Sequence, residues 1–175
     1  MKEEKSNWIL IVFILTFILS VVFSFVSNVV STKFPSGVLF ILLLLTIGIG
    51  VLFDLIGTAA ISANEATFHA LNSKKKRGAK EGIYIVKNSN KISSICNDII
   101  GDICGIISGS IGAMLAISLA FSMNISSTLS SILVAAFVSS LTVGGKAIFK
   151  HIAIKNADTI VFETAKVLSV FHIVK

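Results

Sequence analysis

Two aspartates, Asp98 and Asp102, lie four residues apart in a stretch that is otherwise apolar enough to cross a membrane. The run from Ile92 to Asn124 contains no other charged side chain. Four residues is about one turn of an α-helix, so we expect both carboxylates on one face, with Cβ atoms about 5–6 Å apart. A carboxylate in the hydrocarbon region costs about 2.5–3.5 kcal/mol. A cation, a basic side chain or protons must therefore compensate the pair.

Two further charges, Asp54 and Lys146, interrupt apolar stretches elsewhere in the chain. At about 1.5 Å per residue, all four charges lie roughly 6–12 Å from the cytoplasmic ends of their helices, which predicts one polar cluster. Its formal charge of −2 could be neutralised by one divalent cation, and carboxylate oxygens suit Mg²⁺ or Ca²⁺. The alternatives are a structural network in which Lys146 pairs with one aspartate, or a Lys146 that extends to the membrane surface.

The elements that must position these charges are membrane-spanning helices. Hydrophobic residues make up 54% of the chain and charged residues only 14%, which excludes an ordinary soluble domain. We expect an all-α integral membrane protein with four spans, at Trp8–Val30, Gly37–Ile61, Ser94–Phe121 and Leu129–Phe149. Residues 1–52 would then hold an extra N-terminal helix and the first part of the second span, and residues 53–175 would form the rest of the membrane domain.

Basic residues orient these spans in the cell membrane. Only Lys33 lies in an expected outer loop, whereas 13 Lys and Arg residues lie in expected cytoplasmic segments, so both termini are expected in the cytoplasm. The net charge of +6 does not indicate nucleic-acid binding, because no aromatic stacking platform accompanies the basic run. We expect that run to attract anionic lipid headgroups, at about 1 kcal/mol per charge. It comprises Lys74, Lys75, Lys76 and Arg77.

Amphipathic helices are expected at the cytoplasmic surface. The second span should continue past Asn64 into an amphipathic stretch at Glu65–Lys80, with Phe68 and Leu71 facing the bilayer. Further along, we expect a break at Ser73–Gly78, a short helix at Ala79–Lys87, a turn at Asn88–Asn90 and an interfacial amphipathic helix at Ala157–Val174.

Small residues recur every four positions in the third expected span, at Gly101, Gly105 and Gly109. This spacing lets two helix backbones approach closely in lipid, either within one subunit or at the seam of a homodimer. Cys96 and Cys104 are expected to be small apolar residues rather than ligands. The chain contains no nucleophile–base pair, phosphate-binding loop, zinc-ligand spacing or dinucleotide fingerprint, so an enzyme is not expected.

Three blocks of sequence resemble the transmembrane domain of the CNNM (cyclin M)/CorB–CorC family of magnesium transporters. They are FDLIGTAAISAN at residues 53–64, NSNKISSICNDIIGDI at 88–103 and GGKAIFKHIAIKNADTIVFETA at 144–165. In the second block Asp98 and Asp102 stand on the two asparagines of the family's G-N-x-x-x-N pattern. In the third block Lys146 stands where the family has glutamate. The resemblance covers about residues 53–174, and the first span looks like an addition to it.

The resemblance implies a homodimer and a membrane-buried Mg²⁺ held by Ser, Asn and Glu side chains. Here Asp54, Ile56 and Gly57 occupy the first-block positions, so a serine and the glutamate of the family are replaced. The nucleotide-sensing cytoplasmic domains that usually follow are expected to be missing.

Two functions follow from this resemblance. The chain is either a divergent Mg²⁺/Co²⁺ transporter or binder with Asp54, Asp98 and Asp102 as metal ligands, or a non-transporting assembly or regulatory protein. In the second case Lys146 takes the place of the metal.

Overall fold

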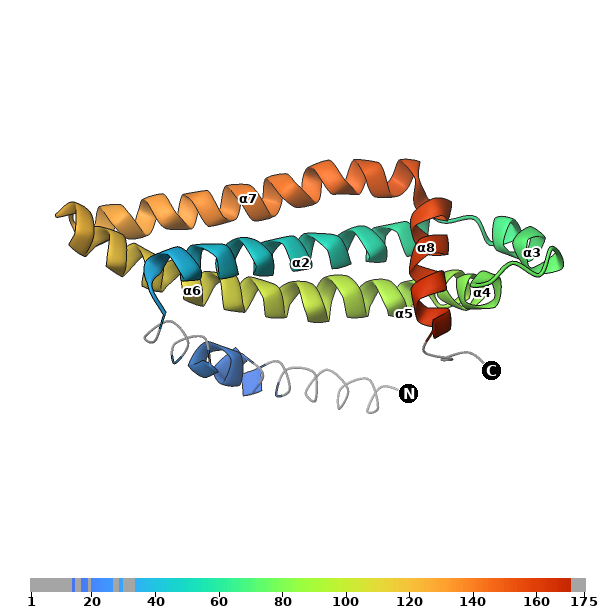
Figure 1. The fold of residues 1–175 in the computed structure, drawn as a ribbon, viewed down its shortest axis with the longest axis horizontal. Helices are drawn as coiled ribbons and strands as arrows, with labels where there is room; N and C mark the ends of the chain where they lie inside the picture. Colours follow the sequence, from blue (N-terminus) through green and yellow to red (C-terminus); the bar gives the residue numbers. More distant parts are fainter. Residues whose placement is uncertain (1–13, 15–16, 19, 27–28, 30–33, 171–175) are drawn as a thin grey trace, which may run out of the picture. The chain divides into compact units, whose positions relative to one another are not determined.

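The computed structural model describes residues 14, 17–18, 20–26, 29 and 34–170, and the described residues include no β-strand. Residues 36–170 are almost continuously helical (Figure 1). The elements are α2 (Ser36–Ser62), α3 (Glu65–Ser73), α4 (Ala79–Lys87), α5 (Ser89–Ser94), the π-helix η1 (Ile95–Ile100), α6 (Gly101–Met123), α7 (Ser127–Lys155) and α8 (Ala157–Val170).

Three helical segments are long and apolar enough to cross a membrane: Ser36–Ser62, Ser89–Met123 and Ser127–Lys155. They confirm three of the four expected spans, and each is longer than predicted. The remaining expected span, Trp8–Val30, lies largely outside the described residues, and those described within it are helical. That span therefore stays a prediction.

The chain divides into two compact units. Unit 1 comprises Met1–Ile47 and Ile103–Ser139, and unit 2 comprises Gly48–Asp102 and Ser140–Lys175. In unit 1, the rings of Phe40 and Phe137 stack with their centroids 6.2 Å apart. The Ser130 hydroxyl donates a hydrogen bond of 2.6 Å to the Ala116 carbonyl oxygen, which satisfies a polar group inside an otherwise apolar unit.

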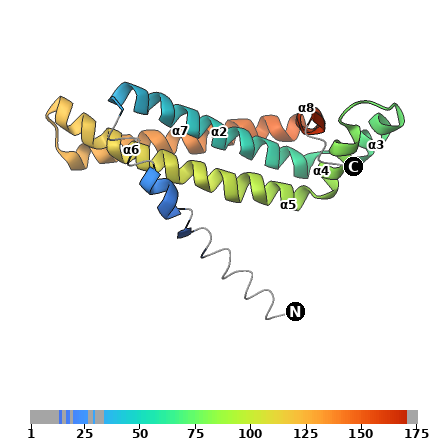
Figure 2. The ribbon, with the colours of Figure 1, turned by 60° about the horizontal axis from the view of Figure 1, so that its bottom comes forward.

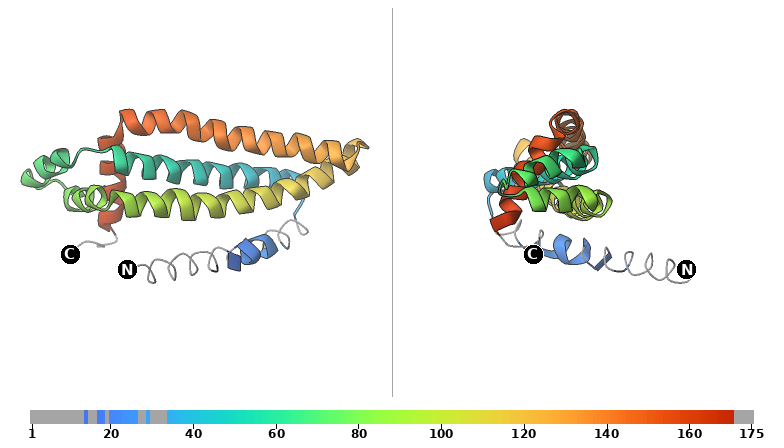
Figure 3. Two further views of the ribbon diagram at one scale, coloured as in Figure 1. Left: turned by 180° about the vertical axis from the view of Figure 1, so that it is seen from behind. Right: turned by 90° about the vertical axis from the view of Figure 1, so that its right-hand side faces the viewer.

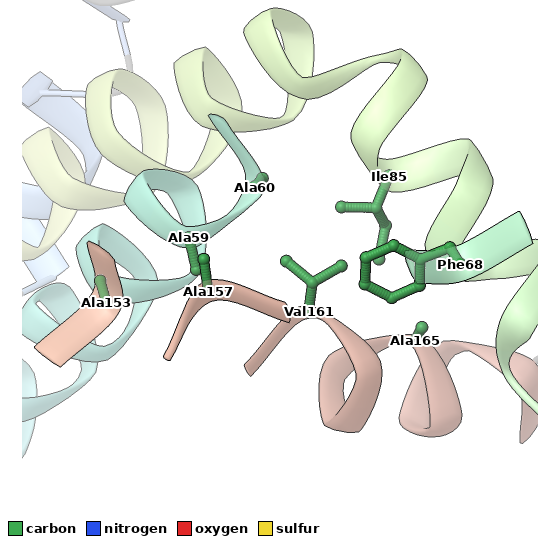
Figure 4. Close-up of a cluster of buried hydrophobic side chains, with 8 residues drawn as sticks. All are labelled: Ala59, Ala60, Phe68, Ile85, Ala153, Ala157, Val161 and Ala165. Carbon is green, nitrogen blue, oxygen red and sulfur yellow. The ribbon is translucent and has the colours of Figure 1, made fainter. Parts of the chain in front are cut away.

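Unit 2 has a core built from five helices. Its fully enclosed side chains come from α2, α3, α4, α7 and α8 (Figure 4). They are Ala59, Ala60, Phe68, Ile85, Ala153, Ala157, Val161 and Ala165. Most of these residues are alanines, so the helix backbones can approach closely around the one aromatic ring.

Helix α8 runs across the direction of α7, from which only Asn156 separates it (Figures 1 and 3). Helices α3 and α4 pack against each other, and α4 also contacts α8 (Figure 2). The expectation that Phe68 faces the bilayer is wrong, because Phe68 is completely buried. Leu71 is partly buried against the same core, and its contact with the bilayer stays a prediction. The spacing of apolar and polar residues indicates that one face of the helix is shielded from water, and here other helices of unit 2 shield Phe68. The position of α3, α4 and α8 at a membrane surface stays a prediction.

The expected continuation of α2 past Asn64 is also wrong. Asn64 has an extended backbone (φ −93°, ψ 118°), and its side-chain oxygen accepts a hydrogen bond from the Ala66 N–H, so it caps a new helix, α3. Asp158, at the start of α8, accepts bonds of 2.8 Å from the Asn64 N–H and 2.7 Å from the Thr67 hydroxyl. A carboxylate at a helix N-terminus also interacts favourably with the helix dipole.

Two details of the third span differ from expectation. The turn at Asn88–Asn90 reduces to Asn88, because α5 already begins at Ser89. The residues around Asp98 then form a π-helix rather than an α-helix, with the Gly101 N–H bonded to the Cys96 carbonyl oxygen. A π-helix bonds residue i to residue i+5, so its turn holds more residues than an α-helical turn.

Candidate cation site

Asp54 and Lys146 form an ion pair inside unit 2. The Lys146 Nζ atom lies 3.5 Å from Asp54 Oδ1, and the two side chains are 34% and 16% exposed, respectively. The pair joins α2 to α7 within two of the apolar spans. Because the carboxylate is the more buried partner, loss of the lysine would leave an uncompensated charge in a poorly solvated position.

Asn97 contributes an unsatisfied oxygen to the same α2 surface. Its side-chain Nδ2 donates a bond of 3.2 Å to the Ser93 hydroxyl, whereas its buried Oδ1 has no hydrogen-bond partner. A Cβ atom at Gly57 would collide with this Oδ1 and lie 3.0 Å from Asn97 Cγ, so only glycine leaves room for the amide. A buried polar atom without a partner is rare in folded proteins and marks a candidate binding site.

The two features start from neighbouring turns of α2: the ion pair joins α2 to α7, and the Gly57–Asn97 contact joins α2 to the third span. Asp54 and Gly57 lie three residues apart on α2, which places them on neighbouring turns of one face. On the facing segment, Asn97 lies against Gly57, and a Cβ atom at Gly101 would lie 3.7 Å from Lys146 Nζ. Lys146 therefore sits beside both Asp54 and the Gly101 backbone, and we call Asp54, Asn97 and Lys146 the polar cluster.

The other two expected ligands, Asp98 and Asp102, are both exposed in the single chain. Neither forms an ion pair within the part of the chain that the structure describes. The π-helix includes Asp98 and ends before Asp102, so the turn between them is not purely α-helical. That the two carboxylates share one face stays a prediction. No group of three or more His, Cys, Asp or Glu side chains among the described residues could hold a metal ion. The structure thus brings Asp54 and Lys146 together and leaves Asp98 and Asp102 outside that contact.

The glycine face of α6 is open along part of its length. Within the described residues, a Cβ atom at Gly105 or Gly109 would meet no atom within 4 Å, whereas Gly101 is buried. Close packing inside one subunit therefore accounts for Gly101 only. The homodimer seam stays a prediction.

The polar cluster consists of a carboxylate (Asp54), an amide oxygen (Asn97) and an ammonium group (Lys146). A carboxylate and an amide oxygen are ligands that Mg²⁺ accepts, usually together with water. The charges of Asp54 and Lys146 identified them in the sequence. Asn97 was missed because it is uncharged, and only charged side chains were considered within the spans. The signal that could have found it is Gly57, since a glycine opposite an amide leaves the space that the amide fills.

The family comparison covers most of the chain. Residues 38–175 match the cyclin M transmembrane N-terminal domain, CNNM. No curated protein and no solved structure gives a significant match. The matched range begins two residues inside the first apolar span and includes the other two spans, the polar cluster and α8. The chain therefore belongs to the CNNM family and carries its transmembrane domain.

Proposed function

We propose that this protein binds Mg²⁺ or a similar divalent cation in the inner half of the membrane and moves it across. The observation that carries the proposal is that a mostly buried carboxylate, Asp54, lies three residues before Gly57 on α2, and that Gly57 faces the buried, unpartnered side-chain oxygen of Asn97. Membership of the CNNM family supports it. The cation is substrate here, so the site must bind it weakly enough to release it.

Lys146 gives the proposed site an internal competitor. Its ammonium group neutralises Asp54 when no metal is bound, at 3.5 Å from the carboxylate. Lys146 is 34% exposed and has a flexible four-carbon side chain, so it can move away to admit a cation. Asp98 and Asp102 are exposed on the third span of the single chain, so a bound cation or a second copy of the chain would have to compensate their charge in a bilayer.

The test is Mg²⁺ titration of the purified full chain by isothermal titration calorimetry. Lys146→Met removes the competing charge and should tighten Mg²⁺ binding, whereas Asp54→Asn should abolish it. Lys150→Met is the matched control, because Lys150 lies one turn further along α7 and is exposed. This control should bind Mg²⁺ like the unmodified protein. A further variant, Asp98→Asn with Asp102→Asn, measures what the exposed acids contribute.

The ion pair itself favours a second candidate, a non-transporting assembly or regulatory protein in which Lys146 permanently replaces the metal. In that case Lys146→Met destabilises the fold by leaving Asp54 unpaired. Breaking a fully buried pair costs about 3–5 kcal/mol, and the loss here should be smaller because Lys146 is partly exposed. Mg²⁺ would not restore the lost stability. Thermal melts of the two lysine variants with and without Mg²⁺ therefore separate the candidates: metal-dependent recovery supports transport, and loss without recovery contradicts it.

We also propose a cell-membrane protein with both termini in the cytoplasm. The 13-to-1 distribution of basic residues supports this orientation. Cysteines introduced at Lys33 and at Ser73 should react with a membrane-impermeant reagent from opposite sides of the membrane. Reaction of both from outside the cell would overturn the four-span arrangement.

A further inference from the structure

A basic cavity lies where the loop between α3 and α4 meets α8. Its volume is about 480 Å³. The charged and hydroxyl side chains that line it are Lys75, Lys76, Arg77, Lys80, Glu81 and Ser169. Four cations thus converge on one carboxylate. Among the described residues none of the four forms an ion pair, so their mutual repulsion is left for a ligand to relieve.

The cavity is held in shape by its own loop. Arg77 Nε donates a bond of 3.2 Å to the Ser169 hydroxyl, which in turn donates one of 2.7 Å to the Lys166 carbonyl oxygen. Gly78 has a positive φ of 87° and is buried so closely that an added Cβ would lie 3.0 Å from the Lys166 N atom. The loop is therefore fixed against α8, and the planar Arg77 head, tied through Nε, keeps its two terminal nitrogens for an anion.

The N-terminus of α4 adds to the positive field. Gly78 is the N-cap of this nine-residue helix, and it has no side chain with which to cap the first N–H groups. Lys80 and Glu81 lie in the first turn. The Ala79 N–H already donates to the Lys76 carbonyl oxygen, so it is chiefly the helix dipole that favours a phosphate group at this position.

A second, apolar cavity of about 340 Å³ adjoins the first. The two share Glu81, and α8 lines them with the consecutive residues Leu168 and Ser169. The apolar cavity is also lined by Phe53 of α2, Tyr84 of α4, and Ile92 and Ile95 of the third span. Phe53, Ile92 and Ile95 belong to helices long enough to span a membrane, so part of this cavity is lined by apolar segments that an acyl chain can contact.

We propose that the two cavities together form a binding site for one anionic glycerophospholipid. The phosphate group occupies the basic cavity, against Arg77 and the α4 N-terminus, and an acyl chain occupies the apolar cavity. Glu81, at their junction, accepts a hydrogen bond from a hydroxyl or ammonium group of the headgroup. This site is more specific than the general attraction of a basic segment to an acidic membrane, because Lys74 belongs to that segment and lines neither cavity.

The experiment measures lipid binding to the purified full chain in an uncharged detergent. The probes are dioctanoyl phosphatidylglycerol, its deacylated form glycerophosphoglycerol, and dioctanoyl phosphatidylcholine. Phosphatidylglycerol should bind most tightly. Arg77→Ala and Lys76→Ala should each weaken phosphatidylglycerol binding about fivefold, since each removes the attraction of one positive charge to the headgroup. Lys74→Ala is the matched control and should change it less than twofold. Ile92→Phe narrows the apolar cavity and should also weaken binding.

Three outcomes would overturn the proposal. Equal binding of glycerophosphoglycerol would mean that the basic cavity takes a soluble phosphate compound. Equal binding of phosphatidylcholine would mean that the site does not recognise the net negative charge of the headgroup. An equal loss for Lys74→Ala and Arg77→Ala would mean that the basic segment acts only as diffuse charge. Thermal melts of each variant verify folding, and the comparison of the three probes on the unmodified chain remains decisive even where a variant unfolds.

Discussion

The two units of the chain differ in how they bury their side chains. Unit 2 encloses Phe68 and Val161 completely and adds directed polar contacts, such as those of Asp158 with α3. Unit 1 leaves large apolar residues such as Phe121 exposed, and a groove of about 510 Å³ opens among apolar side chains that include Phe40 and Phe137. Lipid tails are as apolar as leucine, so exposed side chains of this kind cost nothing in a bilayer. We infer that unit 2 is stabilised by its own packing and unit 1 by its surroundings.

The largest expected effect contrasts two phenylalanines. Phe68 is 0% exposed in unit 2, and Phe40 is 44% exposed in unit 1. Phe68→Ala should lower the free energy of unfolding by about 3–5 kcal/mol, because it opens a cavity in a closed core. Phe40→Ala is the matched control, with an expected loss of about 1 kcal/mol. Unfolding in detergent monitored by circular dichroism measures both. Equal losses would remove the distinction between the units.

The next effect contrasts two glycines of α2. Gly57→Ala drives a methyl group into Asn97 and should cost about 1–3 kcal/mol. Gly48→Ala is the control: no described atom lies within 4 Å of an added Cβ there, and alanine favours a helix, so stability should hold or rise by up to about 1 kcal/mol.

A second substitution localises the clash at Gly57. Adding Asn97→Ala to Gly57→Ala should recover much of the loss, because the colliding amide is then gone. Strict additivity of the two substitutions in denaturant unfolding would show that Asn97 is not the residue that Gly57 accommodates.

A smaller effect on folding is expected at Gly105, whose surroundings in the described chain are open. Gly105→Leu should change the stability of the single chain by less than about 0.5 kcal/mol. It should nevertheless lower the dimer fraction measured by light scattering or cross-linking in detergent, if this face is the seam between two copies. An unchanged dimer fraction would show that the Gly105 face meets lipid only.

The smallest effect is electrostatic and involves Glu65 of α3, which lies outside the three apolar spans. A hydrogen bond from His69, 3.0 Å away, lowers the pKa of Glu65 below its usual value, and Lys87 at 3.7 Å acts in the same direction. A carboxyl group with a depressed pKa in the folded state stabilises the fold above its unfolded pKa. That contribution is lost as the pH falls through the folded value.

Melting temperatures of the unmodified chain and Glu65→Gln should therefore differ at pH 7 and converge as the pH falls below the ordinary glutamate pKa of 4.5. Because Glu65 is exposed, the difference should be small and should shrink with added salt. A gap that stays constant with pH would contradict the assignment.

The sequence alone predicted the class, three spans and two members of the polar cluster. Length and hydropathy specify a span because a bilayer imposes its thickness on every helix that crosses it. Charge inside a span draws attention to Asp54 and Lys146 for a similar reason, since burial of either requires a partner. These features depend on single residues and their local environment.

The features that sequence reasoning missed depend on pairs of distant segments. Phe68 was assigned to the bilayer because periodicity indicates an apolar face but not what covers it. The end of α2 was misplaced because Asp158, 94 residues further along, holds the Asn64 N–H that begins α3. The orphaned oxygen of Asn97 became visible only opposite Gly57. Each case needed the tertiary contact itself.

The π-helix at Ile95–Ile100 has a consequence for the length of the chain. A π-turn accommodates one residue more than the α-helical turn that could replace it. Deleting a single residue from this turn would let the i→i+4 pattern close again, so the span would survive a change that disrupts an ordinary helix. Because the wide turn absorbs its extra residue, the deletion would leave the face of the helix that carries Asp102 nearly unchanged. In the history of such proteins, one codon gained or lost at this position could change the length of the chain while the acidic side chain beyond it keeps its place.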